Sequence, residues 1–352
     1  MRMGWRGALG IVLSALLLWW ALRGVDLRDV WREVRSANAL RLAAMVAVST
    51  LIFPLRVPRW RIILDPVEPN VPAGALWRAI AIGMMVNNVV PARAGELARA
   101  YALTREVPRV PFSASFASLA VDRVFDALVV LLLLLVAMLD PFFPADSRVA
   151  GQPVANWAGS GVIVLVAAVV VLYFVVMLPE RLVGWYALVA RRLSPRLERR
   201  GRDALLAFAG GLGVLRRPGR FGAVLAWTVL HWLVNALAFW IGFRAVGIRA
   251  PFSAALFLQG IIAIGVAVPA APGFFGVFEA LAKAALGTYG VDPTRAVSWA
   301  VSYHLLTFVP ITTLGAVYFV RLGLHFRELQ RPAAAAADAD ARTDRAPAAP
   351  DA

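Results

Sequence analysis

The stretch NNVVPARAGELAR, residues 87–99, decides the fold of this chain. An apolar helical pattern ends in two asparagines, Pro91 interrupts it, and a second helical pattern starts near Gly95. Proline lacks a backbone N–H group and glycine weakens a helix interior, so the chain must break between the two patterns. The stretch therefore predicts a pair of short helices joined by a break rather than one long helix.

The residues around this break are far too apolar for a water-soluble domain. Of the 352 residues, 61% are hydrophobic and 16% are charged, and the mean hydropathy is +0.72. The net charge of +15 comes from arginines placed between apolar segments instead of along one stripe, which argues against nucleic-acid binding. The absence of cysteine excludes disulfides and Cys-ligated metals. The composition predicts an integral membrane protein.

Apolar segments recur along the whole chain, and most are long enough for the roughly 20 residues that a spanning helix needs. They cover 5–22, 40–57, 74–90, 113–139, 158–178, 222–243, 253–268, 274–287 and 297–320. The three short segments flank breaks, and the second break is VPAAPGFFG at residues 268–276. Backbone groups freed by such breaks are tolerated in a membrane only where protein or a wet cavity surrounds them. Both broken pairs are therefore expected either to re-enter the membrane or to lie at its surface.

Arginine distribution predicts the orientation of the segments. The loop 179–220 holds ten arginines against three acidic residues, so it is assigned to the cytoplasm, and the loop 140–157 to the outside. Arg56, Arg59 and Arg61 are taken as a further cytoplasmic signal after the second span. Both termini then lie in the cytoplasm, and the alanine and arginine bias suggests a bacterial inner membrane.

Counting crossings yields two matching halves of opposite orientation. Residues 5–139 and 158–320 each read as span, span, broken pair, span. The predicted fold is an all-α polytopic membrane bundle of two inverted-topology repeats, with about six full spans and two broken or re-entrant helical pairs, in one domain over residues 1–325. Inverted repeats with discontinuous helices are typical of transporters, whose site lies near mid-membrane between the repeats. The tail 331–352 is rich in Ala, Asp, Pro and Arg and is predicted to be disordered and cytoplasmic.

The first break carries candidate anion-binding groups. Asn87 and Asn88 end one helix, and Glu96 opens the next between Arg93 and Arg99. Backbone N–H groups at a helix start together with two guanidinium groups would suit a lipid phosphate. An amphipathic surface helix, with a local Glu96–Arg99 ion pair three residues apart, explains the same residues without a ligand.

Three charged residues precede the most apolar run of the chain. Asp122, Arg123 and Asp126 lead into 127–139, and charges at membrane depth are costly unless they are paired or hydrated. Asp122 and Asp126 share a helix face, which would suit one arginine between them or a role in proton coupling. The alternative is an ion pair with Arg123 at the membrane interface.

The second break contains Pro272, Gly273 and Gly276, and Glu279 follows it in an otherwise apolar helix. A substrate or proton site and a structural Glu279–Lys283 salt bridge both fit this pattern.

Tyr303 and His304 lie early in the last span, at the position that Asp122 and Arg123 hold in the first half. The histidine either contributes to the site or forms a hydrogen bond to a neighbouring helix. His231 and Asn235, four residues apart, are interpreted as contacts between helices.

Three ordered motifs resemble the lysylphosphatidylglycerol synthase transmembrane-region family, also called flippase-like. They are Asn87-Asn88-x-x-Pro91-x-Arg93-x-Gly95-Glu96-x-x-Arg99, Asp122-Arg123-x-x-Asp126 and Pro272-Gly273-x-x-Gly276-x-x-Glu279, and the resemblance spans about 5–325. Larger members of the family carry a cytosolic domain that aminoacylates phosphatidylglycerol, and their membrane region is held to flip the product. This chain ends after the last span, so only lipid translocation is implied.

Two residues depart from the family pattern. The family usually has Glu-Arg at Asp122-Arg123 and often Tyr-Arg at Tyr303-His304, so His304 replaces a permanent cation by a titratable side chain. Stand-alone members are tied to glycosyltransferases and lipid-linked sugars.

The resulting expectation is a translocase for an anionic phospholipid or lipid-linked glycan, without catalytic residues, metal or cofactor. The partner is a membrane lipid, and a glycosyltransferase or another lipid-modifying enzyme is a further candidate partner. The alternative is an accessory subunit of a glycolipid or polyprenyl-linked glycosyltransferase, or the transferase itself. The sequence contains no nucleotide-binding loop, zinc-protease or hydrolase motif.

Overall fold

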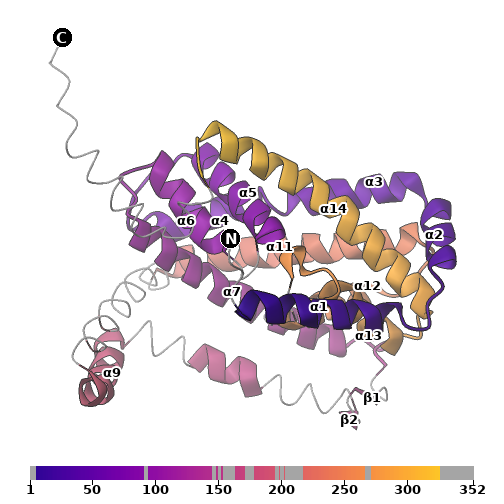
Figure 1. Ribbon diagram of the computed structural model, residues 1–352. Helices are drawn as coiled ribbons and strands as arrows, with labels where there is room; N and C mark the ends of the chain where they lie inside the picture. The colour runs from indigo at the N-terminus through magenta and orange to yellow at the C-terminus, as the bar shows by residue number, and fades with distance from the viewer. Residues whose placement is uncertain are drawn as a thin grey trace.

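The apolar segments form helices, as Figure 1 shows for the computed structural model of the chain. The structure describes residues 5–90, 94–144, 148–149, 152–153, 163–170, 178–194, 198, 202, 217–265 and 271–325. Apart from a hairpin of two short strands, the regular elements of this part are helical, which confirms the all-α part of the predicted fold class.

The helices of the first half are α1 (Trp5–Leu22), α2 (Leu27–Ser36), α3 (Ala39–Leu51), α4 (Arg56–Leu64), α5 (Ala73–Val89), α6 (Gly95–Glu106) and α7 (Phe112–Met138). The strands β1 (Arg148–Val149) and β2 (Gln152–Pro153) follow. The second half contains α9 (Pro179–Leu193), α11 (Pro218–Ala245), α12 (Phe252–Gly265), the 3₁₀ turn η3 (Pro272–Phe274), α13 (Val277–Thr288) and α14 (Pro293–Arg321).

Three described helical stretches are long and apolar enough to cross a membrane: Ala39–Leu64, α11 and α14. α7 is 27 residues long but carries three charged residues within its length, and α1 and α12 contribute shorter apolar stretches. Of the predicted span 158–178, the structure describes residue 178 and residues 163–170, and 163–170 are helical. The number of full spans, six, stays a prediction. The disorder of the tail 331–352 also stays a prediction, because the tail lies outside the described residues.

The predicted second span, 40–57, is not one straight helix. α3 ends at Leu51 and α4 begins at Arg56, with turns around Pro54 between them. A proline cannot continue the helical hydrogen bonds, and the break turns α4 so that Arg56 and Arg59 face the interior. The use of these two arginines as cytoplasmic loop signals was therefore wrong, since both are buried; Arg61 is exposed.

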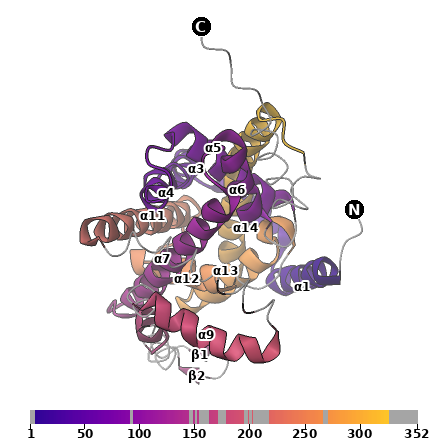
Figure 2. The same ribbon diagram turned by 90° about the vertical axis from the view of Figure 1, so that its left-hand side faces the viewer.

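The two halves exchange helices. The pair α5–α6 belongs to the first half, but α5 packs extensively along α14 of the second half. Conversely, α12 pairs with α13 and packs along α7 of the first half (Figure 1, Figure 2). In addition, α3 of the first half packs along α11 of the second half. Each broken pair thus rests on the last long helix of the other half. Two equivalent halves would produce this reciprocity, but their inverted orientation in a membrane stays a prediction.

Small residues permit the closest of these contacts. A methyl group at Gly95 would collide with the carbonyl oxygen of Gly83 and with Asn87, so α5 and α6 nearly touch. A methyl group at Gly315 would collide with Ala81 and Met85, where α14 crosses α5. Such backbone proximity is common where helices pack without a hydrophobic driving force.

The helical bundle has two distinct ends. α2 closes one end. There the side-chain oxygen of Asn38 caps α3 by accepting from the N–H of Arg41. Oε1 of Glu33 on α2 lies 3.6 Å from Nε of Arg295 on α14. α9 lies at the opposite end (Figure 1, Figure 2), where Arg78 pairs with Glu106. Arg220, which precedes most of α11, pairs with Asp65, and Arg109 lies 3.7 Å from Glu68.

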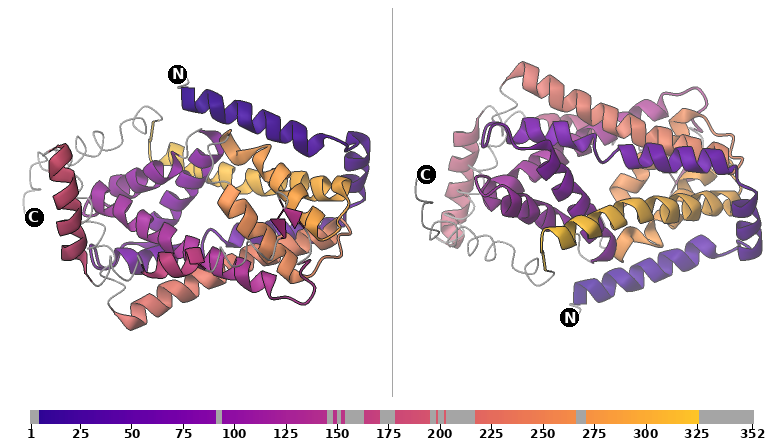
Figure 3. Two further views of the ribbon diagram at one scale, coloured as in Figure 1. Left: turned by 90° about the horizontal axis from the view of Figure 1, so that it is seen from below. Right: turned by 90° about the horizontal axis from the view of Figure 1, so that it is seen from above.

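α1 runs beside the bundle and packs on α13 (Figure 3). The hydroxyl of Ser14 accepts from the N–H of Ala271 at 2.7 Å, which satisfies a backbone group at the second break. Lys283 donates to the carbonyl oxygens of Ala21 and Arg23 at the C-terminal end of α1, 3.0 and 2.8 Å away. Lys283 is thus a C-terminal cap for α1.

Candidate functional site

The two breaks meet around one cavity of about 270 Å³. Asn87 and Asn88 from the end of α5 line it on one side, and Gly273 and Phe274 from η3 on the other. The remaining lining residues come from α3, the turn before α4, α5, α12, α13 and α14. They are Ser49, Ile52, Phe53, Met84, Ile262, Phe278, Tyr303, His304, Thr307, Phe308 and Ile311. The lining is mostly apolar with a few polar groups, which is typical of ligand pockets.

The two asparagines hold the break in place. The side-chain oxygen of Asn87 accepts from the N–H of Gly95 at 2.9 Å, which joins the end of α5 to the start of α6. Asn88 donates to the hydroxyl of Thr312 on α14 at 2.7 Å. Both groups therefore have structural partners and also border the cavity. Arg93 lies outside the described residues.

At the second break, His304 joins α14 to η3 and α13. Its Nε2 is 2.6 Å from the carbonyl oxygen of Gly273, and its Nδ1 is 2.7 Å from Oε1 of Glu279. The other Glu279 oxygen accepts from the N–H of Gly276 at 2.7 Å, so Glu279 caps α13. Gly273 and Gly276 both have positive φ angles, +68° and +84°, which glycine adopts without strain.

This geometry requires an additional proton. A carbonyl oxygen only accepts, so Nε2 of His304 must carry a hydrogen to bond Gly273. Nδ1 then faces a carboxylate oxygen of Glu279, and a hydrogen must lie between those two atoms as well. The pair is thus either imidazolium with carboxylate or neutral imidazole with carboxylic acid. In both forms it holds one exchangeable proton beside the cavity.

The alternative of a Glu279–Lys283 salt bridge was wrong. The Glu279 carboxylate contacts His304, and Lys283 donates to backbone carbonyl groups at the C-terminal end of α1. Pro272 and Gly273 shape η3, and Tyr303 packs its ring on Phe239 and Phe278, with centroids 4.7 and 5.8 Å apart.

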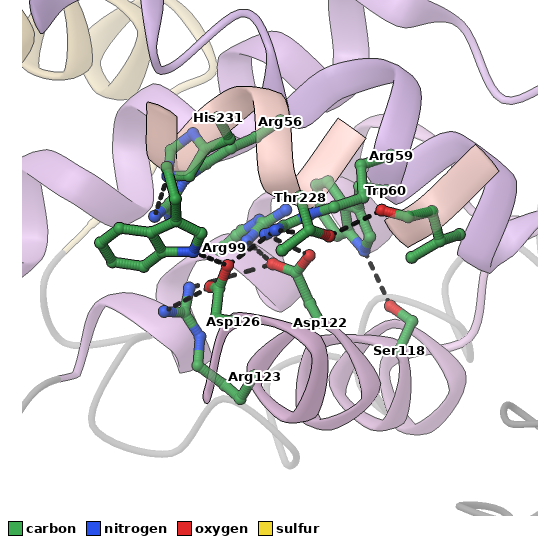
Figure 4. Close-up of polar contacts among 12 residues, drawn as sticks. Arg56, Arg59, Trp60, Arg99, Ser118, Asp122, Arg123, Asp126, Thr228 and His231 are labelled. Carbon is green, nitrogen blue, oxygen red and sulfur yellow. Dashed lines mark hydrogen bonds and ion pairs between the residues drawn. The ribbon is translucent and has the colours of Figure 1, made fainter. Parts of the chain in front are cut away.

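The first half contains a buried charge cluster centred on Arg59 (Figure 4). The Arg59 guanidinium lies 2.5 Å from Oδ1 of Asp122 and 2.7 Å from Oδ1 of Asp126. All three side chains are buried, and Trp232 donates its ring N–H to Asp126 at 2.9 Å. The predicted single arginine between two aspartates on one helix face is therefore present, and it comes from α4.

Two further arginines complete the cluster. Arg99 on α6 contacts Oδ2 of Asp122 at 3.2 Å and stacks on Trp60, 3.9 Å from the ring centroid. Arg123 contacts Asp126 at 3.2 Å and Glu96 at 3.1 Å. The predicted Glu96–Arg99 pair was wrong, because Asp122 and Arg123 take these partners. The alternative that was considered for these residues, an ion pair between Asp126 and Arg123, is present as well, and its place at the membrane interface stays a prediction.

Arg56 lies beside the cluster and faces a histidine. Nδ1 of His231 is 3.0 Å from the carbonyl oxygen of Ile52, which the break after α3 leaves free for a donor. Nδ1 therefore carries the hydrogen, and Nε2 accepts from Arg56 at 3.4 Å. Asn235, one turn on, donates to Gln259 of α12 at 3.2 Å. The interpretation of His231 and Asn235 as contacts between helices agrees with these bonds.

The cluster has one positive charge in excess. Arg56, Arg59, Arg99 and Arg123 face Glu96, Asp122 and Asp126. Several of its polar atoms are buried without a hydrogen-bond partner among the described residues, including Nε and Nη2 of Arg99 and Oε2 of Glu96. A small cavity of about 10 Å³ borders Arg56, Glu96, Arg99 and Arg123, room for about one water molecule. Met84 and Asn87 line both this cavity and the larger one.

The halves therefore carry matching pairs of an acidic and a basic side chain. Glu96 on α6 binds Arg123 on α7, and Glu279 on α13 binds His304 on α14. Asp122 lies ten residues into α7 and His304 eleven into α14, about 15–17 Å from the start of each helix. The predicted correspondence of these positions agrees with the geometry. Within the described residues, no group of three or more acidic or histidine side chains is placed to hold a metal ion.

Sequence reasoning missed Arg56 and Arg59 as members of the site. Their spacing of three residues places them on one helix face, and Pro54 and Pro58 beside them indicate an irregular span rather than a loop. Those two signals together would have found them.

A model of the family described as lysylphosphatidylglycerol synthase TM region matches residues 7–315. The chain belongs to this family. Its membership accounts for the order of the three motifs, each of which lies at a break or in the charge cluster. The chain is also similar to a UPF0104 membrane protein of Methanothermobacter thermautotrophicus, with 24% identity over 88% of this chain and 94% of the relative.

Two other relatives extend this picture. A UPF0104 membrane protein of Pyrococcus horikoshii is 23% identical over 89% of the chain and 95% of its own length. Glycosyltransferase AglD of Haloferax volcanii is 36% identical over 121 residues, which are 34% of this chain and 19% of AglD. The protein is therefore a membrane protein of the lysylphosphatidylglycerol synthase TM-region family, with full-length archaeal relatives.

Proposed function

We propose that this protein is a lipid translocase that moves the head group of an anionic phospholipid or a lipid-linked glycan. The observation that carries the proposal is the 270 Å³ cavity, which residues of both breaks line beside a charge cluster with one unbalanced arginine. A phosphate would balance that charge, and its ester chains would face the apolar lining.

The arginines would bind the phosphate, and the carboxylates would orient them. Arg123 is the most accessible of the four, with 43% of its side chain exposed, and Arg56 contacts no carboxylate among the described residues. Glu96, Asp122 and Asp126 hold the guanidinium groups in fixed directions, which removes the entropy cost of ordering them at binding. Arg93 belongs to this proposal through its motif alone.

The proton held by Glu279 and His304 would couple transport to protonation. Loss of that proton would place the Nδ1 lone pair against a carboxylate and weaken the connection between α14 and η3. Such a change at a break beside the cavity would alter its shape. In this proposal the halves are inverted repeats that move against each other around the cavity, with the reciprocal packing of α5 on α14 and α12 on α7 as support.

We place the α9 end in the cytoplasm, because α9 belongs to the arginine-rich segment 179–220. Both termini then face the cytoplasm. The assignment to a bacterial inner membrane rests on composition alone, and the named relatives are archaeal.

Replacing Arg123 by alanine tests the proposal. Asp126 keeps Arg59 and Trp232, so the fold is expected to persist, while the accessible cation is lost. Translocation of fluorescent phosphatidylglycerol in proteoliposomes, read by dithionite quenching, is expected to fall at least about tenfold, the effect of one charge-assisted contact. Arg105→Ala, an exposed arginine on α6, serves as the control and should transport normally. Wild-type translocation by Arg123→Ala would contradict the site.

A second candidate function follows from the similarity to glycosyltransferase AglD. In that case the protein would be an accessory subunit of a glycolipid or polyprenyl-linked glycosyltransferase, or would itself transfer the sugar. Product formation by the purified protein from a lipid-linked sugar would favour the enzyme. Copurification with a transferase, without lipid translocation, would favour the subunit.

A further inference from the structure

A second polar cavity lies at the α2 end of the bundle, and its volume is about 1100 Å³. Its lining comes from three separated parts of the chain: Arg41 on α3, the turn from Arg244 to Pro251 between α11 and α12, and residues 288–295 before and in α14. Phe142 and Pro144, which follow α7, complete the wall. The size is that of a pocket for a ligand larger than a single ion.

The lining is strongly basic. Arg41, Arg244, Arg249 and Arg295 contribute four positive charges, and Asp292 is the one acidic residue among the residues that line it. Asp292 is already occupied as the N-cap of α14, where it accepts from the N–H of Arg295 at 3.1 Å. Arginine is the side chain best suited to bind phosphate, because its planar group donates two parallel hydrogen bonds.

Two of these arginines are held by contacts within the fold, and two are exposed. Arg41 donates to the carbonyl oxygen of Arg244 at 2.8 Å, and Arg244 stacks 4.9 Å above the ring of Trp240. Nε of Arg244 is buried and has no hydrogen-bond partner within the described part of the chain. Arg249 and Arg295 are exposed, and Arg295 lies 3.6 Å from Glu33. Two arginines that the fold positions, together with two exposed arginines in the same cavity, fit a ligand that carries several negative charges.

We propose that this basic cavity binds a polyanionic group of the phosphate or diphosphate class. The charge cluster around Arg59 lies toward the α9 end, in the first part of α7, so the basic cavity is a separate site. The group belongs either to a lipid head at the membrane surface or to a soluble phosphorylated compound. The inference goes beyond translocation, because binding at this site requires no movement of lipid.

The test measures binding of inorganic diphosphate to the full-length protein in a neutral detergent by isothermal titration. The variant Arg249→Gln/Arg295→Gln removes the two exposed arginines, one of which faces a carboxylate. Its matched control is Arg28→Gln/Arg32→Gln on α2, which removes two exposed charges at the same end, one of them paired with Asp29. The cavity variant is expected to bind at least about tenfold more weakly, and the control within about twofold of wild type.

Equal binding by wild type and the cavity variant would overturn the site. An equal loss in both variants would also overturn it, because net charge alone would then attract the anion. If the double variant fails to fold, Arg249→Gln in its exposed loop provides the same comparison. Competition identifies the source: displacement of diphosphate by dioctanoyl phosphatidic acid at lower concentration than by inorganic phosphate indicates a lipid head, and equal displacement a soluble compound. Since no membrane is present, these results are independent of translocation.

Discussion

Replacing Arg59 by alanine is expected to lower the free energy of unfolding by about 3–5 kcal/mol, the cost of breaking a buried ion pair. Arg59 is fully buried and lies between Asp122 and Asp126, at 2.5 and 2.7 Å. Without it, the carboxylates of Asp122 and Asp126 on the same face of α7 repel each other across the space that the guanidinium filled. Neither can reach water at low cost, so repulsion and desolvation both act against the fold.

Unfolding by a denaturing detergent, followed by circular dichroism, measures this effect. Arg220→Ala is the control, because it removes an ion pair with Asp65 that is about one-third exposed and worth at most about 1 kcal/mol. Adding Asp122→Asn to Arg59→Ala should restore part of the stability by removing one of the opposed charges. A loss with Arg59→Ala no larger than with Arg220→Ala would show that the cluster does not stabilise the fold.

Replacing Glu279 by glutamine is expected to leave the fold intact and to abolish the response of translocation to pH. The amide oxygen can still accept from Gly276, and the amide nitrogen can donate to Nδ1 of His304. Both hydrogen bonds persist, but the exchangeable proton is gone. The rate is expected to fall by at least about tenfold, which corresponds to about 1.4 kcal/mol in the barrier.

Translocation measured over a range of pH separates this proton from a purely structural role. Glu279→Ala removes both hydrogen bonds and should also lower the stability, whereas Glu279→Gln should lower the rate alone. A Glu279→Gln variant with the rate and pH response of the wild type would eliminate proton coupling at this pair, and the translocase proposal would then need another driving force.

The sequence predicted the breaks well, because proline and glycine act locally. The pairs α5–α6 and α12–α13 form where NNVVPARAGELAR and VPAAPGFFG indicated them. It also predicted that Asp122 and Asp126 share a helix face, since helix periodicity fixes which residues lie together, and an arginine between them was one of the two interpretations of that face. These predictions depend on contacts within one segment.

The partners from distant segments could not be predicted in this way. Arg59 reaches Asp122 from another helix, and its place depends on the break after α3, which looked like the end of a span. Lys283 stands four residues from Glu279, yet the free carbonyl groups at the end of α1 bind it instead. Helix spacing shows which pairs can form, and tertiary packing decides which pairs do.

The claim that a lipid head group passes through the cavity between the two breaks can be tested by filling that cavity. Thr307 lines it from α14, and Val309, two residues further on the same helix, is 60% exposed outside it. Fluorescent phosphatidylglycerol translocation is therefore compared for Thr307→Trp and Val309→Trp in proteoliposomes. The account predicts that Thr307→Trp abolishes translocation and Val309→Trp preserves the wild-type rate. Wild-type translocation by both variants would contradict it.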